Sequence, residues 1–380
     1  MKILYLSYTL PKPSSPNRGV FLLRRIEELL NQNINLTVIT TEHIHNIFKY
    51  KKKYNFNELG FNVNQVVNSL IKFENPYNYT NIFFNNNVAS IYKIYKQNKC
   101  ELIHAHFIRD GLFALKLKEK HNIPYIVSLH GFDITIMPLK SKRMRDITLR
   151  VLESADKCIF VSESLLNTAK AFGYSMDNYT VINNGYKPDI FKHSKNSKSE
   201  KNLIIGFCGY LIKRKRADKL PIVFKYIKDS IPHSKLIIIG DGPLKSQMIS
   251  DFDKLELLSS VTFTGSISQE EMSKYMNLMD VFILPSIHEG FPTVVPEAMA
   301  CGVQVVASDA DGTPEAVANA GYIVNQNEPN FEKKFAEQVV YALKNPIPKE
   351  VVLERAKELT WENIVLKEIE VYKEVLEILQ

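Results

Sequence analysis

The chain has 380 residues, of which 45% are hydrophobic and 23% charged. This length suits two or three domains, and the composition excludes a disordered, collagen-like or small disulfide-stapled protein. Residues 1–190 carry 25 basic and 15 acidic side chains, a net charge of +10, whereas residues 191–380 carry 23 and 26, a net charge of −3. The basic half predicts an anionic partner, which could be a membrane surface, an acidic lipid-linked substrate or a nucleic acid. A solvated, lysine-rich surface is an equally good interpretation.

Two further features narrow these alternatives. Lysine outnumbers arginine by 38 to 10 and no nucleic-acid-binding motif is evident, so nucleic acid is the least favoured partner. No run of about 18 apolar residues occurs, so we expect no transmembrane helix. The four cysteines are widely spaced and form no CxxC pair, which fits a reducing compartment. We therefore expect a cytoplasmic protein, peripheral at the inner face of the cell membrane.

Short apolar runs alternate with amphipathic helical patterns through the first half of the chain. The predicted strands are Lys2–Tyr8, Asn35–Thr40, Ile103–Phe107, Tyr125–Leu129, Cys158–Ser162 and Thr180–Asn183, and the predicted helices are Gly19–Asn31 and Leu112–His121. This alternation is typical of a parallel sheet covered by helices on both faces.

The polar segment Lys192–Asn202 predicts a linker, after which the alternation restarts. The predicted strands are Leu203–Cys208, Lys235–Ile239, Val261–Thr264, Val281–Pro285 and Val303–Ser308, and the predicted helices are Ala217–Asp229, Ser268–Met279, Pro296–Cys301 and Thr360–Gln380. Ser268 and Glu271 have the spacing of a capping box at the start of one of these helices.

These patterns predict an α/β protein made of two facing Rossmann-like domains. We place them at residues 1–192 and 203–360, with a linker at 193–202 and a final helix over 361–380 that packs back on the first domain. Parallel sheets of this kind bind ligands at the carboxyl ends of their strands, so a cleft between the domains is the expected site.

The most specific stretch is EGFPTVVPEAMACG, which runs from Glu289 to Gly302 and joins a predicted buried strand to a helix. Free N–H groups at the turn around Gly290 would suit a phosphate. Glu289 and Glu297 are poorly placed to bind phosphate, but their carboxylates can accept hydrogen bonds from sugar hydroxyls. The alternative is that Glu297 only complements the helix dipole and Glu289 is a loop charge.

This stretch resembles the Glu-x7-Glu signature of retaining glycosyltransferases of family 4, which have the GT-B fold. Other motifs support the resemblance along nearly the whole chain and occur in the family's order. They are NRG at 17–19, HGFD at 130–133, VINNG at 181–185, GFCGYL at 206–211 with Lys215, GDGP at 240–243 and DGTPE at 311–315.

The resemblance implies that the second domain binds a nucleotide-sugar donor, with a UDP-sugar favoured, and that the first binds a glycan or lipid-linked acceptor. Glu297 would bind the donor ribose, Glu289 the hydroxyls of the transferred sugar, and Lys215 the diphosphate. A fixed cation there stabilises the charge that develops on the leaving group, so no metal and no other cofactor is expected. The implied catalytic residues are His130, Glu289 and Lys215, and the other implied donor contacts are Gly19, Arg214, Gly240, Gly290, Phe291, Pro292, Thr293 and Val294.

The sequence departs from the family pattern at two positions of the loop after residue 209. Tyr210 stands where the family has arginine, and Arg216 where it has glycine. We expect either Arg214 or Arg216 to supply the missing guanidinium.

Two further sets of residues allow more than one interpretation. His104 and His106 lie on one face of a predicted strand, a spacing that metal sites use, but no third ligand is near in sequence, so contact with the acceptor at the strand end is preferred. Asp133 is assigned to the acceptor site, either as a general base for the acceptor hydroxyl or, slightly favoured, as a cap on the following turn.

Together these features predict a metal-independent, retaining glycosyltransferase of bacterial surface polysaccharide biosynthesis, such as capsule, lipopolysaccharide or teichuronic-type polymers. One alternative is a non-catalytic GT-B module that only binds nucleotide-sugars, which Tyr210 makes conceivable. Another is a different GT-B enzyme, such as a sugar-nucleotide epimerase or a phosphorylase, against which the Glu289 and Glu297 signature argues.

Overall fold

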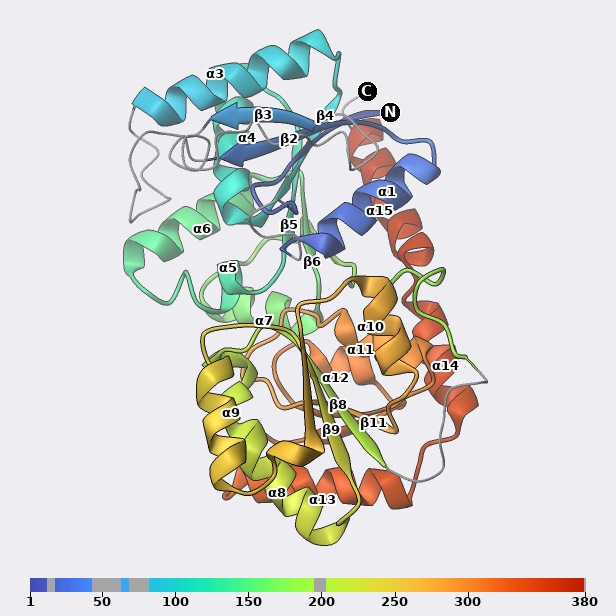
Figure 1. Ribbon diagram of the computed structural model, residues 1–380. Coiled ribbons are helices and arrows are strands. Elements are labelled where there is room, and N and C mark those ends of the chain that lie inside the picture. The colour runs from blue at the N-terminus through green and yellow to red at the C-terminus, as the bar shows by residue number, and fades with distance from the viewer. Residues whose placement is uncertain (12–17, 43–62, 68–81, 195–202, 379–380) are drawn as a thin grey trace. The chain divides into compact units, whose positions relative to one another are not determined.

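The computed structural model describes residues 1–11, 18–42, 63–67, 82–194 and 203–378 (Figure 1). The chain divides into two compact units. Unit 1 comprises Met1–Asn183 and Ile364–Gln380, and unit 2 comprises Asn184–Asn363. Most of the linker expected at 193–202 lies outside the described residues. No helix of the described part of the chain combines the length and the apolarity that a membrane crossing requires.

Unit 1 is built on a seven-stranded sheet in which every strand pair is parallel. The strand order is β3-β2-β1-β4-β5-β6-β7. The bounds are β1 Lys2–Leu6, β2 Asn35–Glu42, β3 Val63–Val67, β4 Leu102–His106, β5 Tyr125–Leu129, β6 Lys157–Phe160 and β7 Tyr179–Val181. The order reverses between β1 and β4, and ligands bind at such a reversal in doubly wound sheets.

Helices cover this sheet, as the alternation predicted. They are α1 Val20–Asn31, α3 Ile82–Gln97, α4 Phe107–His121, α5 Phe132–Thr135, α6 Lys142–Ser154, α7 Glu163–Ala171 and the C-terminal α15 Trp361–Ile378, which enters unit 1 at Ile364. All five residues of β4 and of β5 are buried. Such continuous burial is typical of a parallel sheet that is covered on both faces.

Unit 2 holds a second all-parallel sheet, of six strands, in the order β10-β9-β8-β11-β12-β13. Its strands are β8 Ile204–Cys208, β9 Lys235–Ile239, β10 Val261–Gly265, β11 Val281–Leu284, β12 Gln304–Ser308 and β13 Tyr322–Val324. Its helices are α8 Leu220–Ser230, α9 Lys245–Lys254, α10 Gln269–Met276, α11 Val294–Ala300, α12 Thr313–Val317, α13 Phe331–Lys344 and α14 Lys349–Glu358. The order reverses between β8 and β11, which places a second expected binding point there.

Local sequence rules account for several boundaries in unit 2. The predicted capping box is confirmed, because the Ser268 hydroxyl accepts a hydrogen bond from Glu271 N at 3.2 Å and the Glu271 carboxylate accepts one from Ser268 N at 3.2 Å. The helix predicted over Ala217–Asp229 begins as a short 3-10 helix, Ala217–Lys219, and continues as α8. The phenyl rings of Phe207 and Phe224 are buried in the core, where each contributes roughly 1.5–3 kcal/mol of hydrophobic stabilisation.

Candidate active site

Two loops meet at the carboxyl ends of β8 and β11 in unit 2. Ile287 N donates a hydrogen bond to Arg214 O at 2.8 Å, and the Arg214 guanidinium donates to His288 O at 2.6 Å. The loops therefore hold each other in place although more than 70 residues separate them in sequence. This is where the strand order reverses, so the local topology and the motif residues indicate the same place.

Lys215 and Glu289 form an ion pair at this point, with Lys215 Nζ donating to Glu289 Oε1. Arg214 Nη1 lies 3.7 Å from the other carboxylate oxygen, Oε2. The Glu289 side chain is only 8% exposed and that of Lys215 14%. Each charge thus has a partner of opposite sign before any ligand arrives. An anionic group of a ligand could pair with Lys215 while a ligand hydroxyl group donates to Glu289. Neither buried charge would then be left without a partner.

The backbone of Glu289 is held from the loop that follows β12. Glu289 N donates to Asp311 Oδ2 at 3.0 Å, and Glu289 O accepts from Gly312 N at 3.0 Å. Asp311 has a left-handed backbone with φ 40°, and burial raises the pKa of its carboxyl, although the nearby His288 ring lowers it. Asp311 was noticed in the sequence only as part of a motif. Its supporting role could not be seen because the contact joins separate loops.

Of the two candidate arginines, Arg214 lies beside Glu289 and Arg216 does not contact it. Arg216 donates to Pro285 O at 3.1 Å and to Gln326 O at 3.2 Å, and its guanidinium lies 4.0 Å from the centre of the Phe331 ring. These contacts fix Arg216 as a structural residue. The side chain of Arg214 is 41% exposed, so it remains accessible beside the ion pair.

Gly240 shapes the loop next to this ion pair. It has φ 129°, and a Cβ atom there would overlap the carbonyl oxygen of Gly209, in the loop that carries Lys215. Gly242 has the same constraint, because its Cβ would lie 2.6 Å from Leu211 N. The two loops pack backbone against backbone, and only glycine allows this approach.

The second glutamate of the signature lies in the first turn of α11. Glu297 is 5% exposed, and Gln269 donates to its Oε1 at 3.4 Å. In the turn before α11, Phe291 and Pro292 are buried, whereas Gly290 and Thr293 are half-buried, as is Val294, the first residue of α11. The buried Phe291 and Pro292 present no exposed side chain, so contacts of this turn with a ligand would be made chiefly by its backbone.

In unit 1 the predicted residues lie at the carboxyl ends of β1 and β5. Gly19 starts α1 with φ 75°, and a Cβ there would overlap Thr9 O. His130 follows β5, and Asp133 Oδ1 accepts hydrogen bonds from His130 N at 3.2 Å and from Gly131 N at 2.9 Å. Burial raises the pKa of the Asp133 carboxyl to about 6. The Asp133 side chain thus binds backbone N–H groups that precede it and does not cap the following turn, and its contact with an acceptor stays a prediction.

The expectation that His104 contacts the acceptor at the strand end is wrong for this structure. His104 is fully buried, with Nδ1 2.7 Å from Tyr372 Oη and Nε2 2.8 Å from Ser128 Oγ. Both ring nitrogens therefore have partners inside unit 1. The residues that engage them lie on β5 and α15, far away in the sequence, so no sequence pattern could indicate this burial.

His106 is also fully buried, so the expected direct contact with the acceptor is not available to it either. It lies on the same face of β4 as His104, with the ring centres 4.2 Å apart, as the spacing predicted. Its Nδ1 lies 3.0 Å from Nε2 of His130. Among the described residues, no group of three or more His, Cys, Asp or Glu side chains could hold a metal ion.

One cluster at the switch point of unit 1 was missed in the sequence. The guanidinium of Arg109 lies 4.6 Å from the centre of the Tyr8 ring, and that of Arg18 lies 5.6 Å from it. Neither arginine has a carboxylate partner in the part of the chain that the structure describes. Positive charge is thus concentrated after β1 and at the start of α4.

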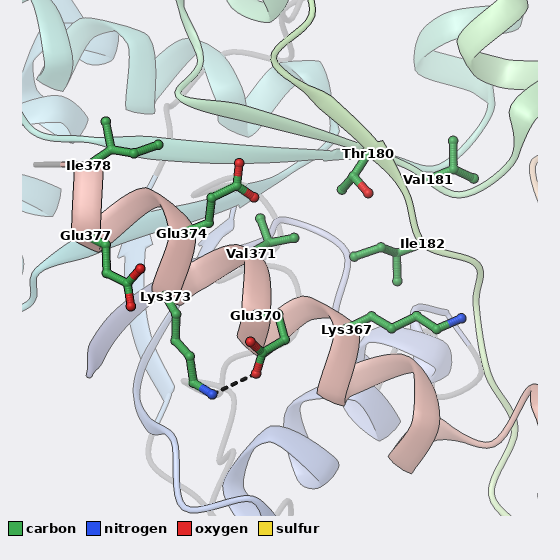
Figure 2. Close-up of a pocket in the computed structure, with 10 residues that line it drawn as sticks. All are labelled: Thr180, Val181, Ile182, Lys367, Glu370, Val371, Lys373, Glu374, Glu377 and Ile378. Atoms are coloured by element: carbon green, nitrogen blue, oxygen red, sulfur yellow. Dashed lines mark hydrogen bonds and ion pairs between the residues drawn. The ribbon is translucent and has the colours of Figure 1, made fainter.

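Unit 1 also has an open groove beside its edge strand (Figure 2). Thr180, Val181 and Ile182 line one side, and side chains of α15 line the other, where Lys373 pairs with Glu370 at 2.6 Å. None of the residues predicted for the site lines this groove. Its charged groups are of both signs, so it does not select for an anion or a cation.

Two parallel, doubly wound units in one chain define the GT-B fold, as predicted. Solved structures agree: the Anabaena protein HepE, described in complex with UDP-glucose, superposes with a TM-score of 0.75 at 18% identity, covering 98% of this chain and all of that one. Residues 19–190 match the family model "Glycosyltransferase Family 4", and residues 189–359 match "Glycosyl transferases group 1". The chain belongs to this family of glycosyltransferases, as the resemblance predicted.

Curated relatives support the same assignment. The chain is 28% identical over 331 residues to TuaC of Bacillus subtilis, described as a putative teichuronic acid biosynthesis glycosyltransferase, with 82% of each chain covered. It is 30% identical over 290 residues to an uncharacterised glycosyltransferase of Methanocaldococcus jannaschii, with 74% of this chain and 78% of the relative covered.

Proposed function

We propose that the protein is a retaining, metal-independent glycosyltransferase that transfers a sugar from a UDP-sugar to a growing surface polysaccharide of a bacterium. The observation that carries this proposal is the Lys215–Glu289 ion pair at the switch point of unit 2. Lys215 supplies a cation for the diphosphate, and Glu289 supplies a hydrogen-bond acceptor for the sugar. The solved UDP-glucose complex of HepE favours a UDP-sugar donor.

In this proposal the leaving group is stabilised by side chains instead of a metal. Negative charge develops on the diphosphate as the bond to the sugar breaks, and Lys215 and Arg214 are the cations nearest to Glu289. Fixed charges aimed at developing charge lower the barrier because they need no reorganisation during the reaction. Glu297 binds the ribose, and the turn Gly290–Val294 contributes backbone groups.

The proposed acceptor is an anionic or lipid-linked glycan held by unit 1. The Arg18 and Arg109 guanidinium groups beside Tyr8 favour an acceptor with a carboxylate or a phosphate. The name of the relative TuaC, which refers to teichuronic acid biosynthesis, supports an acidic glycan as the acceptor. His130 stands at the end of β5 in the same unit and is the proposed contact to the reacting sugar.

We further propose a peripheral association with the inner face of the cell membrane. Phe132 and Leu139 are 54% and 60% exposed on unit 1, and the exposed basic residues Lys140, Lys142 and Arg143 follow directly. Exposed apolar side chains next to clustered basic ones suit an anionic lipid surface, where each basic residue contributes roughly 1 kcal/mol.

The test is release of nucleoside diphosphate from UDP-, GDP- and ADP-sugars, with a membrane-lipid extract as acceptor and with chelator present. We expect release from one donor, a product that keeps the anomeric configuration, and a loss of roughly 100-fold or more in Lys215→Ala and Glu289→Gln. Lys213→Ala is the matched control, because Lys213 is an exposed neighbour outside the ion pair.

Three outcomes would contradict the proposal. Binding of UDP without turnover of any donor would favour the non-catalytic module, and conversion of the donor without a glycosylated product would favour an epimerase or a phosphorylase. Loss of release in chelator would contradict metal independence.

A further inference from the structure

One peptide group of the candidate site is held at both ends by charged side chains. It is the peptide that joins His288 to Glu289. Its carbonyl oxygen accepts a hydrogen bond from Nη1 of Arg214 at 2.6 Å, and its N–H donates to Oδ2 of Asp311 at 3.0 Å. Arg214 follows β8 and Asp311 follows β12, so the two charges reach the peptide from separate loops. Hydrogen bonds with one ionised partner are stronger than neutral ones.

The two charges together select one orientation of this peptide. After a rotation by half a turn, the carbonyl oxygen would face the Asp311 carboxylate, and the N–H would face the Arg214 guanidinium. Neither contact could form a hydrogen bond, because a carboxylate is only an acceptor and a guanidinium is only a donor. The opposite signs of the two side chains therefore act in the same sense, and removal of either one weakens the selection.

The peptide on the other side of Glu289 is held by the same loop. Gly312 follows Asp311 directly, and its N–H donates to Glu289 O at 3.0 Å. The planes of the two flanking peptides fix φ and ψ of a residue, and these angles set the direction of its Cα–Cβ bond. The loop after β12 therefore determines the direction in which the Glu289 side chain leaves the backbone, towards Lys215.

The backbone conformation of Asp311 indicates that its side chain matters. Its φ is 40°, a left-handed value that glycine adopts freely and other residues adopt less readily. It lies in a turn in which Thr313 N donates to Ala310 O at 2.8 Å. Glycine would suit this turn, but it would lack the carboxylate that binds Glu289 N. The same oxygen, Oδ2, lies 3.2 Å from Nδ1 of His288, so the ring helps to orient the carboxylate.

We infer that Asp311 is a positioning residue for Glu289. It fixes the peptide before Glu289 and thereby places the Glu289 carboxylate where it accepts a hydrogen bond from the donor sugar. Asp311 acts through Glu289 and not by a contact of its own with the sugar or the diphosphate. The role of the Glu289 carboxylate rests on the proposed function, whereas the held peptide belongs to the free protein.

The held peptide can be tested without substrate, by amide hydrogen exchange of the full chain labelled with 15N-glutamate. Glu289→Ala identifies the Glu289 amide signal by its loss. We expect this amide to exchange more than tenfold faster in Asp311→Gly, which removes the acceptor but suits the backbone. Asp311→Asn keeps a side-chain oxygen and should stay close to the wild type. Asp309→Asn is the matched control, because Asp309 lies in the same loop but accepts from Gln326 N instead.

Sugar transfer gives the second readout, as a double-mutant cycle. Asp311→Gly should lower kcat by roughly tenfold, the effect of one lost charge-assisted hydrogen bond, and Asp311→Asn should keep most of kcat. The affinity for UDP should be unchanged, because UDP carries no sugar. In the Glu289→Ala background, Asp311→Gly should have little further effect, since no carboxylate is left to position. A merely structural role would instead lower the unfolding temperature and the UDP affinity, with losses that add.

Three results would overturn the inference. They are an unchanged exchange rate of the Glu289 amide in Asp311→Gly, equal losses of kcat in Asp311→Gly and Asp311→Asn, and a further tenfold loss when Asp311→Gly is added to Glu289→Ala. A wild type without transfer activity would contradict only the proposed function, because the exchange rates are measured without substrate and still test the held peptide.

Discussion

The two units use the same sheet topology to present opposite kinds of chemistry. At the switch point of unit 2, Lys215 and Glu289 form a charged pair that remains partly accessible. In unit 1, Nε2 of His130 lies 3.0 Å from Nδ1 of the buried His106, and the same unit contains a fully buried charge pair, Arg25–Glu368. The fold thus determines where a site lies, whereas side-chain chemistry determines what it binds. Unit 2 presents a pair of opposite charges at its switch point, and unit 1 presents the His130 ring.

The largest effect that separates the two units is expected from Arg25→Met. The side chains of Arg25 and Glu368 are both fully buried, and Arg25 Nε lies 3.2 Å from Glu368 Oε2. Removal of the guanidinium leaves a buried carboxylate without its main counter-charge, which costs about 3–5 kcal/mol. Urea unfolding monitored by signals from unit 1 should show this loss, while UDP binding measured below the transition should be unchanged.

The double variant Arg25→Met/Glu368→Gln is the control for this prediction. It removes both charges, so it should recover much of the lost free energy of unfolding. If the double variant were as unstable as Arg25→Met, the loss would come from packing of the arginine stem and not from the ion pair.

Acidification should weaken unit 1 before unit 2. Burial lowers the pKa of His104, His106 and His130, so the folded state keeps these rings neutral while the unfolded chain protonates them. The stability they contribute is complete above the unfolded pKa of about 6.5 and decreases as the pH falls below it. Asp133, whose pKa is raised to about 6, acts in the opposite direction, but the three histidines outnumber it in unit 1.

Denaturant unfolding at several pH values between 7.5 and 5 measures this prediction. Unit 1 should lose stability on acidification, and His106→Asn should lose less, because one buried imidazole has been removed. Equal pH dependence in the two proteins would show that His106 is already protonated in the folded state.

A smaller loss of stability is expected when either of two glycines with similar positive φ angles is replaced. Gly240 in unit 2 and Gly173 in unit 1 both have φ above 110°. A Cβ at Gly240 would overlap Gly209 O, whereas one at Gly173 would meet only Leu149 Cδ1 at 3.6 Å. Gly173→Ala should therefore cost about 1 kcal/mol from strain alone, and Gly240→Ala should cost more and also weaken UDP binding. Thermal unfolding of both variants measures the loss of stability, and calorimetry measures UDP binding. Equal losses of stability in the two variants would contradict the prediction.

Much of the fold could be predicted because its strands are short apolar runs with clear ends. The bounds of β5 and β9 agree residue for residue with the prediction. Several helices were missed, including α6, whose buried residues Met144, Ile147 and Val151 alternate with charged ones. The start of α4 was placed late, at Leu112, because Phe107 begins the helix from a left-handed conformation with φ 70°, which sequence rules discourage for a bulky residue.

The candidate site was predictable in part. The sequence assigned Lys215 and Glu289 to one site, because both follow neighbouring parallel strands, but their ion pair was not predicted. The burial of His104 and the structural contacts of Arg216 could not be predicted from the sequence, because their partners Tyr372 and Phe331 lie more than 100 residues away. A local pattern carries no information about which distant side chain will cover it.

The division of α15 has a consequence for how the protein is made. Unit 1 includes Ile364–Gln380, a segment that is synthesised after all of unit 2. Glu368 and Tyr372, which contact Arg25 and His104, are therefore synthesised after the whole of unit 2. Unit 2 can fold as soon as its own strands have been synthesised. Unit 1 needs α15 to complete its interior, although most of unit 1 is synthesised first.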